Sequence, residues 1–204
     1  CTPDHRFHAS RSGRFDEVRA VSEFNAKGTR IRRCEVDALL GDVQEPHAYT
    51  IGAMLGDGYC NAKTYKNRLF VSSESDAIPS AIAHEIGCEY HKCKGENYTY
   101  ALHASGFNHY DDWMKGRLAH EKTCDQEVIR NWNRESLLAF VAGLIDTDGS
   151  VCVRKDCGAL IFRFGMQAKP VVDAFCYAML ALWQHEPSVF LDDRERYVNG
   201  PVYS

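Results

Sequence analysis

Two aspartates, Asp57 and Asp148, stand in similar surroundings 91 residues apart. Each closes a run of small and apolar residues and directly precedes a glycine. If the runs are helices, their carboxylates lie at the negative pole of the helix dipole, which is mildly destabilising unless a cation compensates. Two similar runs that each end in an acid therefore predict one site, formed by both aspartates about a pseudo-twofold axis.

The elements that position these acids are predicted from the runs themselves. Residues 140–145 are small or apolar on all sides, which indicates a helix covered all round. We expect it over 135–148, and the similar upstream run indicates a second helix over 47–57. Gly52 and Gly143 stand in the middle of the two runs, and residues without a Cβ atom allow two helix backbones to approach closely.

The remaining pattern predicts an α+β fold of two pseudo-symmetric units, about 47–121 and 122–204, each with the order αββαββα. The second unit is expected to lack its closing helix. The expected helices are 47–57, 76–87, 109–120, 135–148 and 170–184, and the expected strands are 59–66, 69–74, 88–93, 97–104, 150–155, 159–167, 188–192 and one that begins at Tyr197.

Strand alternation predicts antiparallel sheets with helices on one face and a polar open face. In strand 159–167, apolar residues Leu160, Phe162, Phe164 and Met166 alternate with a polar side. An open polar face suits recognition of bases in the major groove of DNA, and a solvated surface is the equally weighted alternative. The candidate DNA-binding residues are Asn61, Lys63 and Tyr65 in the first unit and Arg163 and Gln167 in the second.

The segment Val141–Gly149, with the sequence VAGLIDTDG, resembles the signature of the LAGLIDADG homing endonucleases. Thr50–Gly58, TIGAMLGDG, is similar to the divergent first copy in single-chain members. The resemblance implies paired helices and DNA-facing sheets in a monomer with internal pseudo-twofold symmetry. It assigns the last acid of each motif, Asp57 and Asp148, as a catalytic residue and metal ligand. It also assigns Asp146 as a packing or capping acid, and the corresponding position of the first copy is occupied by Leu55.

The implied metal is Mg²⁺, a hard cation that prefers oxygen ligands. It would activate water and neutralise the leaving oxygen during hydrolysis of one phosphodiester bond in each strand of a long, asymmetric double-stranded DNA target. Family members also carry a lysine shortly before the second motif helix, which corresponds to Lys122 here. Its ammonium would polarise the water or stabilise the charge that develops; an exposed loop lysine is the alternative.

A fold does not fix a function, so a non-cleaving nucleic-acid binder, such as an RNA maturase or a transcription regulator, is the alternative to the nuclease. The presence of both Asp57 and Asp148 favours the nuclease, because a binder of a polyanion has no need of two anions at its surface.

The N-terminal segment Cys1–Phe7, CTPDHRF, is similar to the Thr-x-x-His segment of intein (Hint) splicing domains. The resemblance implies that Thr2 and His5 would polarise an amide bond at a splice junction. It predicts a short β-rich Hint fragment over 1–44, with Gly41–Pro46 as a linker, and an intein-encoded endonuclease domain over 45–204. Self-splicing by this chain alone is not expected, because the sequence lacks the C-terminal His-Asn pair of an intein.

Composition is that of a globular chain of one or two domains, with 204 residues, 45% hydrophobic and 25% charged. The net charge of −4 argues mildly against nucleic acid as a partner, although residues 1–33 carry eight Lys/Arg against four acids. No apolar run is long enough to span a bilayer and no signal peptide opens the chain, so we expect no membrane partner and a cytoplasmic, nucleoid or nuclear location rather than secretion.

Nine cysteines without a signal peptide indicate reduced thiols. Four residues between positions 84 and 93 are candidate zinc ligands: His84, Cys88, His91 and Cys93. Their spacing is not the repeated C-x2-C pattern that zinc favours, and buried thiols with surface imidazoles are the preferred alternative.

Overall fold

The computed structural model describes residues 6–10, 17–20, 30–31, 40–60, 68–104, 111–114, 117–155, 158, 160–184, 187–192 and 202–203. The chain divides into two compact units, Cys1–Val36 and Asp37–Ser204. In the first unit, β1 (Arg6–Ser10) pairs in antiparallel fashion with β2 (Glu17–Ala20) and β3 (Arg30–Ile31). The candidate splicing residues Thr2 and His5 lie outside the described residues.

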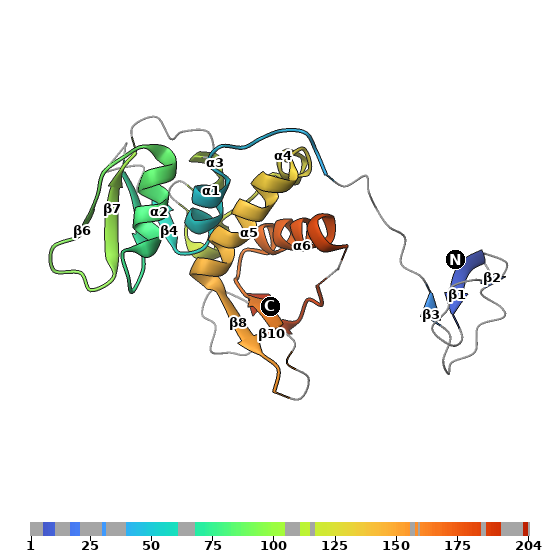
Figure 1. Cartoon of the computed structure of the whole chain (residues 1–204). Coiled ribbons are helices and arrows are strands. Elements are labelled where there is room, and N and C mark those ends of the chain that lie inside the picture. The colour runs from blue at the N-terminus through green and yellow to red at the C-terminus, as the bar shows by residue number, and fades with distance from the viewer. Residues whose placement is uncertain are drawn as a thin grey trace. The chain divides into compact units, whose positions relative to one another are not determined.

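Two helices lie side by side at the centre of the second unit, α1 (Ala48–Leu55) and α5 (Arg134–Asp148) (Figure 1). Seven of the eight residues of α1 are buried, as expected for a helix that is apolar all round. The helix α5 begins at Asn133, whose side chain accepts a hydrogen bond from the backbone N–H of Ser136 at 2.9 Å. Both motif helices predicted from the sequence are therefore confirmed.

The amino end of α1 is capped by a carboxylate from another helix, α2 (Ala77–Ile86). His47, which precedes α1, makes no side-chain cap of its own. Glu85 of α2 instead accepts hydrogen bonds from the backbone N–H groups of Tyr49 at 3.2 Å and Thr50 at 2.7 Å. These donors have no partner within the helix, and an anion there also complements the helix dipole, so Glu85 fixes where α1 starts.

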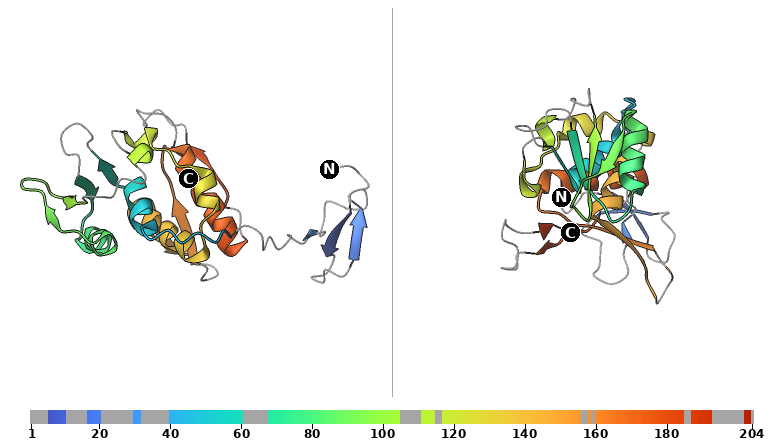
Figure 2. Two further views of the ribbon diagram at one scale, coloured as in Figure 1. Left: turned by 90° about the horizontal axis from the view of Figure 1, so that it is seen from above. Right: turned by 90° about the vertical axis from the view of Figure 1, so that its left-hand side faces the viewer.

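Four antiparallel strands follow α1 and form one sheet in the order β4-β5-β7-β6. They lie next to one another in the right-hand view of Figure 2. One face of this sheet is buried in the core through Leu69, Val71 and Leu102. The strands are β4 (Gly58–Cys60), β5 (Arg68–Ser72), β6 (Tyr90–Lys92) and β7 (Thr99–His103).

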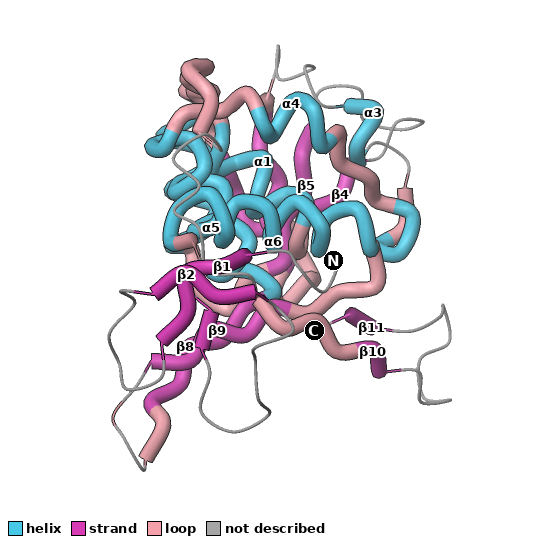
Figure 3. Tube along the Cα trace, turned by 90° about the vertical axis from the view of Figure 1, so that its right-hand side faces the viewer, coloured by secondary structure: helices cyan, strands magenta, loops and turns pink. Residues whose placement is uncertain are grey.

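Beyond α5, the strands β8 (Gly149–Val153) and β9 (Leu160–Phe164) form an antiparallel hairpin that projects from the carboxyl end of α5 (Figure 1). The helix α6 (Lys169–Trp183) packs Phe175 on Phe164, with ring centroids 4.7 Å apart. The short strands β10 (Leu191–Asp192) and β11 (Val202–Tyr203) pair with each other (Figure 3). Met166 forms an isolated bridge to Tyr203.

The predicted helix over 109–120 is wrong in extent. Its described residues contain only the short helix α3 (Asp111–Met114) and, after the extended residue Leu118, a 3-10 turn over Ala119–Glu121. Gly116 within the predicted span lowers helix stability by about 1 kcal/mol relative to alanine. A helix that was not predicted, α4 (Gln126–Arg130), begins at Asp125, whose carboxylate accepts a hydrogen bond from Glu127 N at 2.9 Å.

The segment Gly41–Pro46, interpreted as a linker from its composition, is paired with the start of α5. The backbone N–H of Val43 donates to Asn131 O at 2.9 Å, and Asn133 N donates to Val43 O at 2.7 Å. Glu45 N also donates to the hydroxyl of Ser136 at 2.7 Å. Backbone pairing of this kind depends on the partner segment, so side-chain composition does not reveal it.

The apolar face predicted for strand 159–167 is only partly covered. Phe164 and Met166 are buried, whereas Phe162 is 54% exposed. Its cross-strand partner Val151 is 51% exposed as well. Alternation therefore identified which residues share a face, but not how much of that face other elements cover. Among the described residues, no helix is long and apolar enough to cross a membrane.

Candidate active site

The backbones of α1 and α5 touch at the two motif glycines. A Cβ atom added to Gly52 would overlap the carbonyl oxygen of Phe140. A Cβ atom added to Gly143 would overlap the carbonyl oxygen of Tyr49 and stand 2.6 Å from Ala53 N. Contacts this short leave no room for any side chain, so the close approach predicted from Gly52 and Gly143 is confirmed.

The seam brings the carboxyl ends of both helices together. At Gly56, just beyond the end of α1, an added Cβ atom would overlap the hydroxyl of Thr147 and lie 3.3 Å from Asp148 Oδ2. Asp57 follows in the turn between α1 and β4, and its backbone carbonyl accepts a hydrogen bond from Ser72 N at 3.2 Å. Asp57, the second residue after α1, and Asp148, the last residue of α5, thus present two carboxylates at one end of the helix pair.

The two carboxylates influence each other. Asp57 is exposed and Asp148 is partly buried. Burial, followed by the negative charge of Asp57, raises the pKa of Asp148 to about 6, although the positive charge of Lys122 opposes the shift. Although Asp57 is exposed, the protein around it removes part of its hydration and thereby raises its pKa as well, again against the effect of Lys122. A cluster in which two acids resist ionisation together is one that a cation would stabilise.

Lys122 lies beneath this cluster, and its side chain is buried with 4% exposure. Its ammonium donates hydrogen bonds to three consecutive carbonyl oxygens, those of Met54 at 3.2 Å, Leu55 at 2.9 Å and Gly56. Burial lowers the pKa of Lys122 to about 8, while Asp148 and Asp57 oppose that shift. The exposed loop lysine considered as the alternative is therefore excluded.

Asp146 contacts the other helix of the pair. Its Oδ2 atom accepts a hydrogen bond from the hydroxyl of Tyr49 at 3.0 Å. Burial, followed by the nearby charge of Asp146, raises the pKa of Tyr49 above its ordinary value. Asp146 therefore links α5 to α1, in agreement with the packing role that the sequence resemblance implied.

The predicted DNA-binding residues have mixed positions. Asn61, Lys63 and Tyr65 lie outside the described residues. Arg163 is exposed on β9, while Gln167 lies in a bend three residues beyond the end of that strand and so does not share its face.

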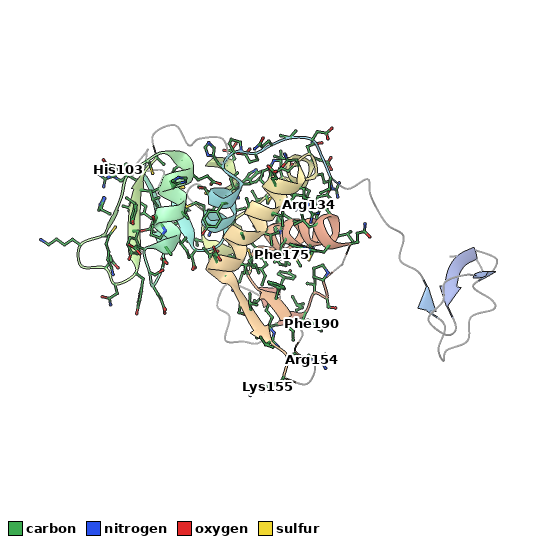
Figure 4. All side chains as sticks on the ribbon, viewed as in Figure 1. His103, Arg134, Arg154, Lys155, Phe175 and Phe190 are labelled. Carbon is green, nitrogen blue, oxygen red and sulfur yellow. The ribbon has the colours of Figure 1, made fainter. Side chains whose placement is uncertain are left out.

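Other polar residues share the open face of the four-stranded sheet and were not singled out from the sequence. Arg68 of β5 pairs with His103 of β7, and His91 of β6 lies on the same face, with its ring centroid 5.3 Å from that of His103. Figure 4 shows His103 on β7, at the end of that strand. No alternation marked this face in the sequence, because the three central residues of β5 and of β7 are all buried.

The candidate zinc ligands do not form a metal site. Within the described part of the chain, which includes residues 84–93, no group of three or more His, Cys, Asp or Glu side chains could hold a metal ion. Cys88 and Cys93 are partly buried free thiols, and His91 is exposed on β6. These positions agree with the alternative of ordinary thiols and surface imidazoles.

No protein-family model and no curated protein sequence matches the chain. Solved structures do. The N-terminal LAGLIDADG domain of DUF199/WhiA aligns with a TM-score of 0.50 and 9% identity, covering 85% of this chain and 84% of that domain. I-DmoI, in complex with DNA and Mn, aligns with a TM-score of 0.50 and 19% identity, covering 78% and 87%. The chain therefore has the LAGLIDADG fold, an α+β fold with antiparallel sheets.

Proposed function

We propose that the chain is a site-specific DNA endonuclease that hydrolyses phosphodiester bonds in both strands of a duplex, with divalent cations held by Asp57 and Asp148. The observation that carries this proposal is the convergence of the two aspartates at the glycine seam. The contacts that join the two helices at Gly52 and Gly143, and the Tyr49–Asp146 hydrogen bond, involve neither acid.

The carboxylate pair fits Mg²⁺. This cation is usually bound by one or two carboxylates and completes its octahedron with water and substrate phosphate oxygens. Two carboxylates at the end of a helix pair, one of them exposed, match that requirement and would not suffice for a metal that needs three or more protein ligands. The structure of I-DmoI with DNA and Mn supports a divalent cation in this fold.

The residues of the chain then have distinct parts in the reaction. Bound at the pair, Mg²⁺ would supply an activated water and a counter-charge for the leaving oxygen. Asp57, in the turn after α1, and Asp148, at the end of α5, would hold the cation, so that each strand of the duplex meets one acid. The Gly52–Gly143 seam fixes the spacing of the acids, and Lys122 provides a positive charge beside both of them.

The DNA is held by the open faces of the two sheets. In the first sheet we assign Arg68, His91 and His103 to this surface, together with the predicted residues Asn61, Lys63 and Tyr65. In the second sheet, Arg163 of β9 is the candidate, and Gln167, in the bend beyond β9, is a further candidate outside the sheet face. The different composition of the two faces suits a long, asymmetric target.

A monomer with internal pseudo-twofold symmetry supplies both faces. In the second half, β8 pairs with β9 and β10 pairs with β11, and an isolated antiparallel bridge joins Met166, two residues beyond β9, to Tyr203 of β11. This connection is compatible with the strand order β4-β5-β7-β6 of the first half. The equivalence of Gly52 with Gly143, and of Asp57 with Asp148, at the same separation of 91 residues supports the same symmetry.

The N-terminal segment extends the proposal to an intein context. We interpret residues 1–44 as part of a Hint splicing domain, with Thr2 and His5 as its characteristic residues, and 45–204 as the endonuclease domain. The antiparallel arrangement of β1, β2 and β3 is compatible with a β-rich Hint fragment. A cytoplasmic, nucleoid or nuclear location would give the enzyme access to its target.

Selection from a randomised duplex library tests the proposed function. The full chain is incubated with the library and Mg²⁺, and cleaved molecules are ligated to adapters and sequenced. We expect one long consensus site that is cut in both strands, with no products when EDTA replaces Mg²⁺. Enrichment of bound but never cleaved duplexes would instead identify a non-cleaving DNA binder.

A further inference from the structure

The ammonium group of Lys122 has no hydrogen-bond donor left for a substrate. A lysine ammonium carries three N–H donors. All three are directed at backbone carbonyls, those of Met54, Leu55 and Gly56. Contact with a phosphate or an attacking water would therefore require one of these hydrogen bonds to break inside a buried site.

The three carbonyls are those that an α-helix leaves without partners at its carboxyl end. A buried cation at this position satisfies them and also complements the negative pole of the dipole of α1. Because Gly56 directly precedes Asp57, the same contacts determine where the chain leaves α1. On its other side, Asp57 is held by the hydrogen bond from Ser72 N to its carbonyl oxygen at 3.2 Å.

The backbone that carries Lys122 is itself anchored. Thr123 N donates to Trp113 O at 2.9 Å, and Glu121 N donates to Leu118 O at 2.9 Å. The side chain of Glu121 also accepts a hydrogen bond from Leu118 N at 3.0 Å. Lys122 therefore joins two structured segments that are distant in sequence, the end of α1 and the stretch that follows α3.

We propose that Lys122 is a positioning residue, which holds the carboxyl end of α1 so that Asp57 and Asp148 can share a cation, and that it does not contact the substrate. The inference rests on the proposed cation site and replaces the direct catalytic role that the sequence resemblance implied for this lysine. If Lys122 acted only as a positive charge, its removal would strengthen cation binding, whereas a positioning role predicts that its removal weakens cation binding.

Binding of Mn²⁺ without DNA, followed by electron paramagnetic resonance of the free ion, distinguishes the two roles. In Lys122→Met, loss of a nearby positive charge by itself would strengthen binding of a cation. A positioning role predicts the reverse, roughly a 10-fold or greater loss of affinity, as found for residues that orient metal ligands. Lys122→Arg should also lose affinity, because a planar guanidinium retains the charge but cannot direct three donors at three adjacent carbonyls.

Lys169→Met is the matched control, since Lys169 is an exposed lysine on α6 that pairs with Asp173 at 2.6 Å. We expect parental Mn²⁺ affinity in this variant. Unchanged or stronger binding by Lys122→Met, or parental binding by Lys122→Arg, would overturn the positioning role. Absence of Mn²⁺ binding by the parent chain would instead count against the proposed cation site.

A measurement on the parent chain decides the matter even if the Lys122 variants do not fold. Nuclear magnetic resonance can detect couplings between the Nζ atom of Lys122 and the carbonyl carbons of Met54, Leu55 and Gly56. A positioning residue keeps these couplings in the free protein and after addition of Ca²⁺ and a target duplex. Their loss on addition of duplex, with a new coupling to phosphorus, would show that Lys122 contacts the substrate.

Discussion

Replacement of Asp148 by asparagine is expected to abolish DNA cleavage and to leave DNA binding intact. Asparagine has nearly the same shape but no charge, so the helix seam is preserved while the cation loses one of its two carboxylates. Loss of a cation from a phosphodiester transition state raises the activation free energy of cleavage by several kcal/mol. An increase of about 4 kcal/mol corresponds to roughly a 10³-fold lower rate. Single-turnover cleavage of the selected duplex and a gel-shift measurement report the two properties separately.

The control for this variant is Asp146→Asn, which changes an acid two residues earlier in the same helix. This variant loses only the negative charge of the carboxylate whose oxygen accepts the hydrogen bond from the Tyr49 hydroxyl at 3.0 Å. We expect its cleavage rate to stay close to that of the parent. Cleavage by Asp148→Asn at the parental rate would remove Asp148 from the reaction.

The same variant should alter how stability depends on pH. Burial and the charge of Asp57 raise the pKa of Asp148 from 3.8 to about 6 in the folded chain. A group with a raised folded pKa stabilises the fold in its protonated form, below pH 4, and this contribution is lost as the pH rises through 6. Without added metal, Asp148→Asn should lose less stability between pH 4 and pH 7 than the parent does in denaturant titrations.

Replacement of Gly143 by alanine is expected to have the largest effect on stability. The added methyl group would overlap the carbonyl oxygen of Tyr49 and stand 2.6 Å from Ala53 N, so two backbones have to move apart. Overpacking of a core typically lowers the free energy of unfolding by about 1–3 kcal/mol. Because the added methyl group here clashes with rigid backbone, we expect a loss of roughly 3 kcal/mol or more. Urea unfolding followed by circular dichroism measures the change.

Ala142→Leu provides the comparison, because Ala142 is the preceding residue of the same helix and faces solvent. A larger side chain there should leave the unfolding midpoint nearly unchanged. If Gly143→Ala were as stable as the parent chain, the helices could not be in backbone contact at this glycine, and the spacing of the two acids would need another origin.

Local sequence signals predicted the helix pair because the relevant information lies within each run. The glycine in the middle, the apolar residues around it and the acid at the end all belong to one helix, and a repeat at a fixed separation relates the two. The same is true of the end of α2 at Gly87, which adopts φ 65°. Conformations set by neighbouring residues in the chain are accessible to pattern analysis.

Contacts between distant segments were not predictable in this way. The carbonyls that Lys122 binds lie 66 to 68 residues away in the sequence. The backbone pairing of Val43 with Asn131 and Asn133 likewise joins segments separated in the sequence by about the length of one αββαββα unit. The role of Glu85 as a cap for α1 depends on how α2 packs against it. Likewise, Arg68, His91 and His103 share a surface only through strand register.

The central claim is that Asp57 and Asp148 bind one set of cations beneath a DNA duplex. Anomalous diffraction from crystals of the chain grown with its target duplex and Mn²⁺ tests it most directly. The account predicts Mn²⁺ peaks within bonding distance of carboxylate oxygens of both Asp57 and Asp148, and of a phosphate from each strand. Mn²⁺ bound elsewhere on the chain, or these two carboxylates turned away from the duplex, would contradict it.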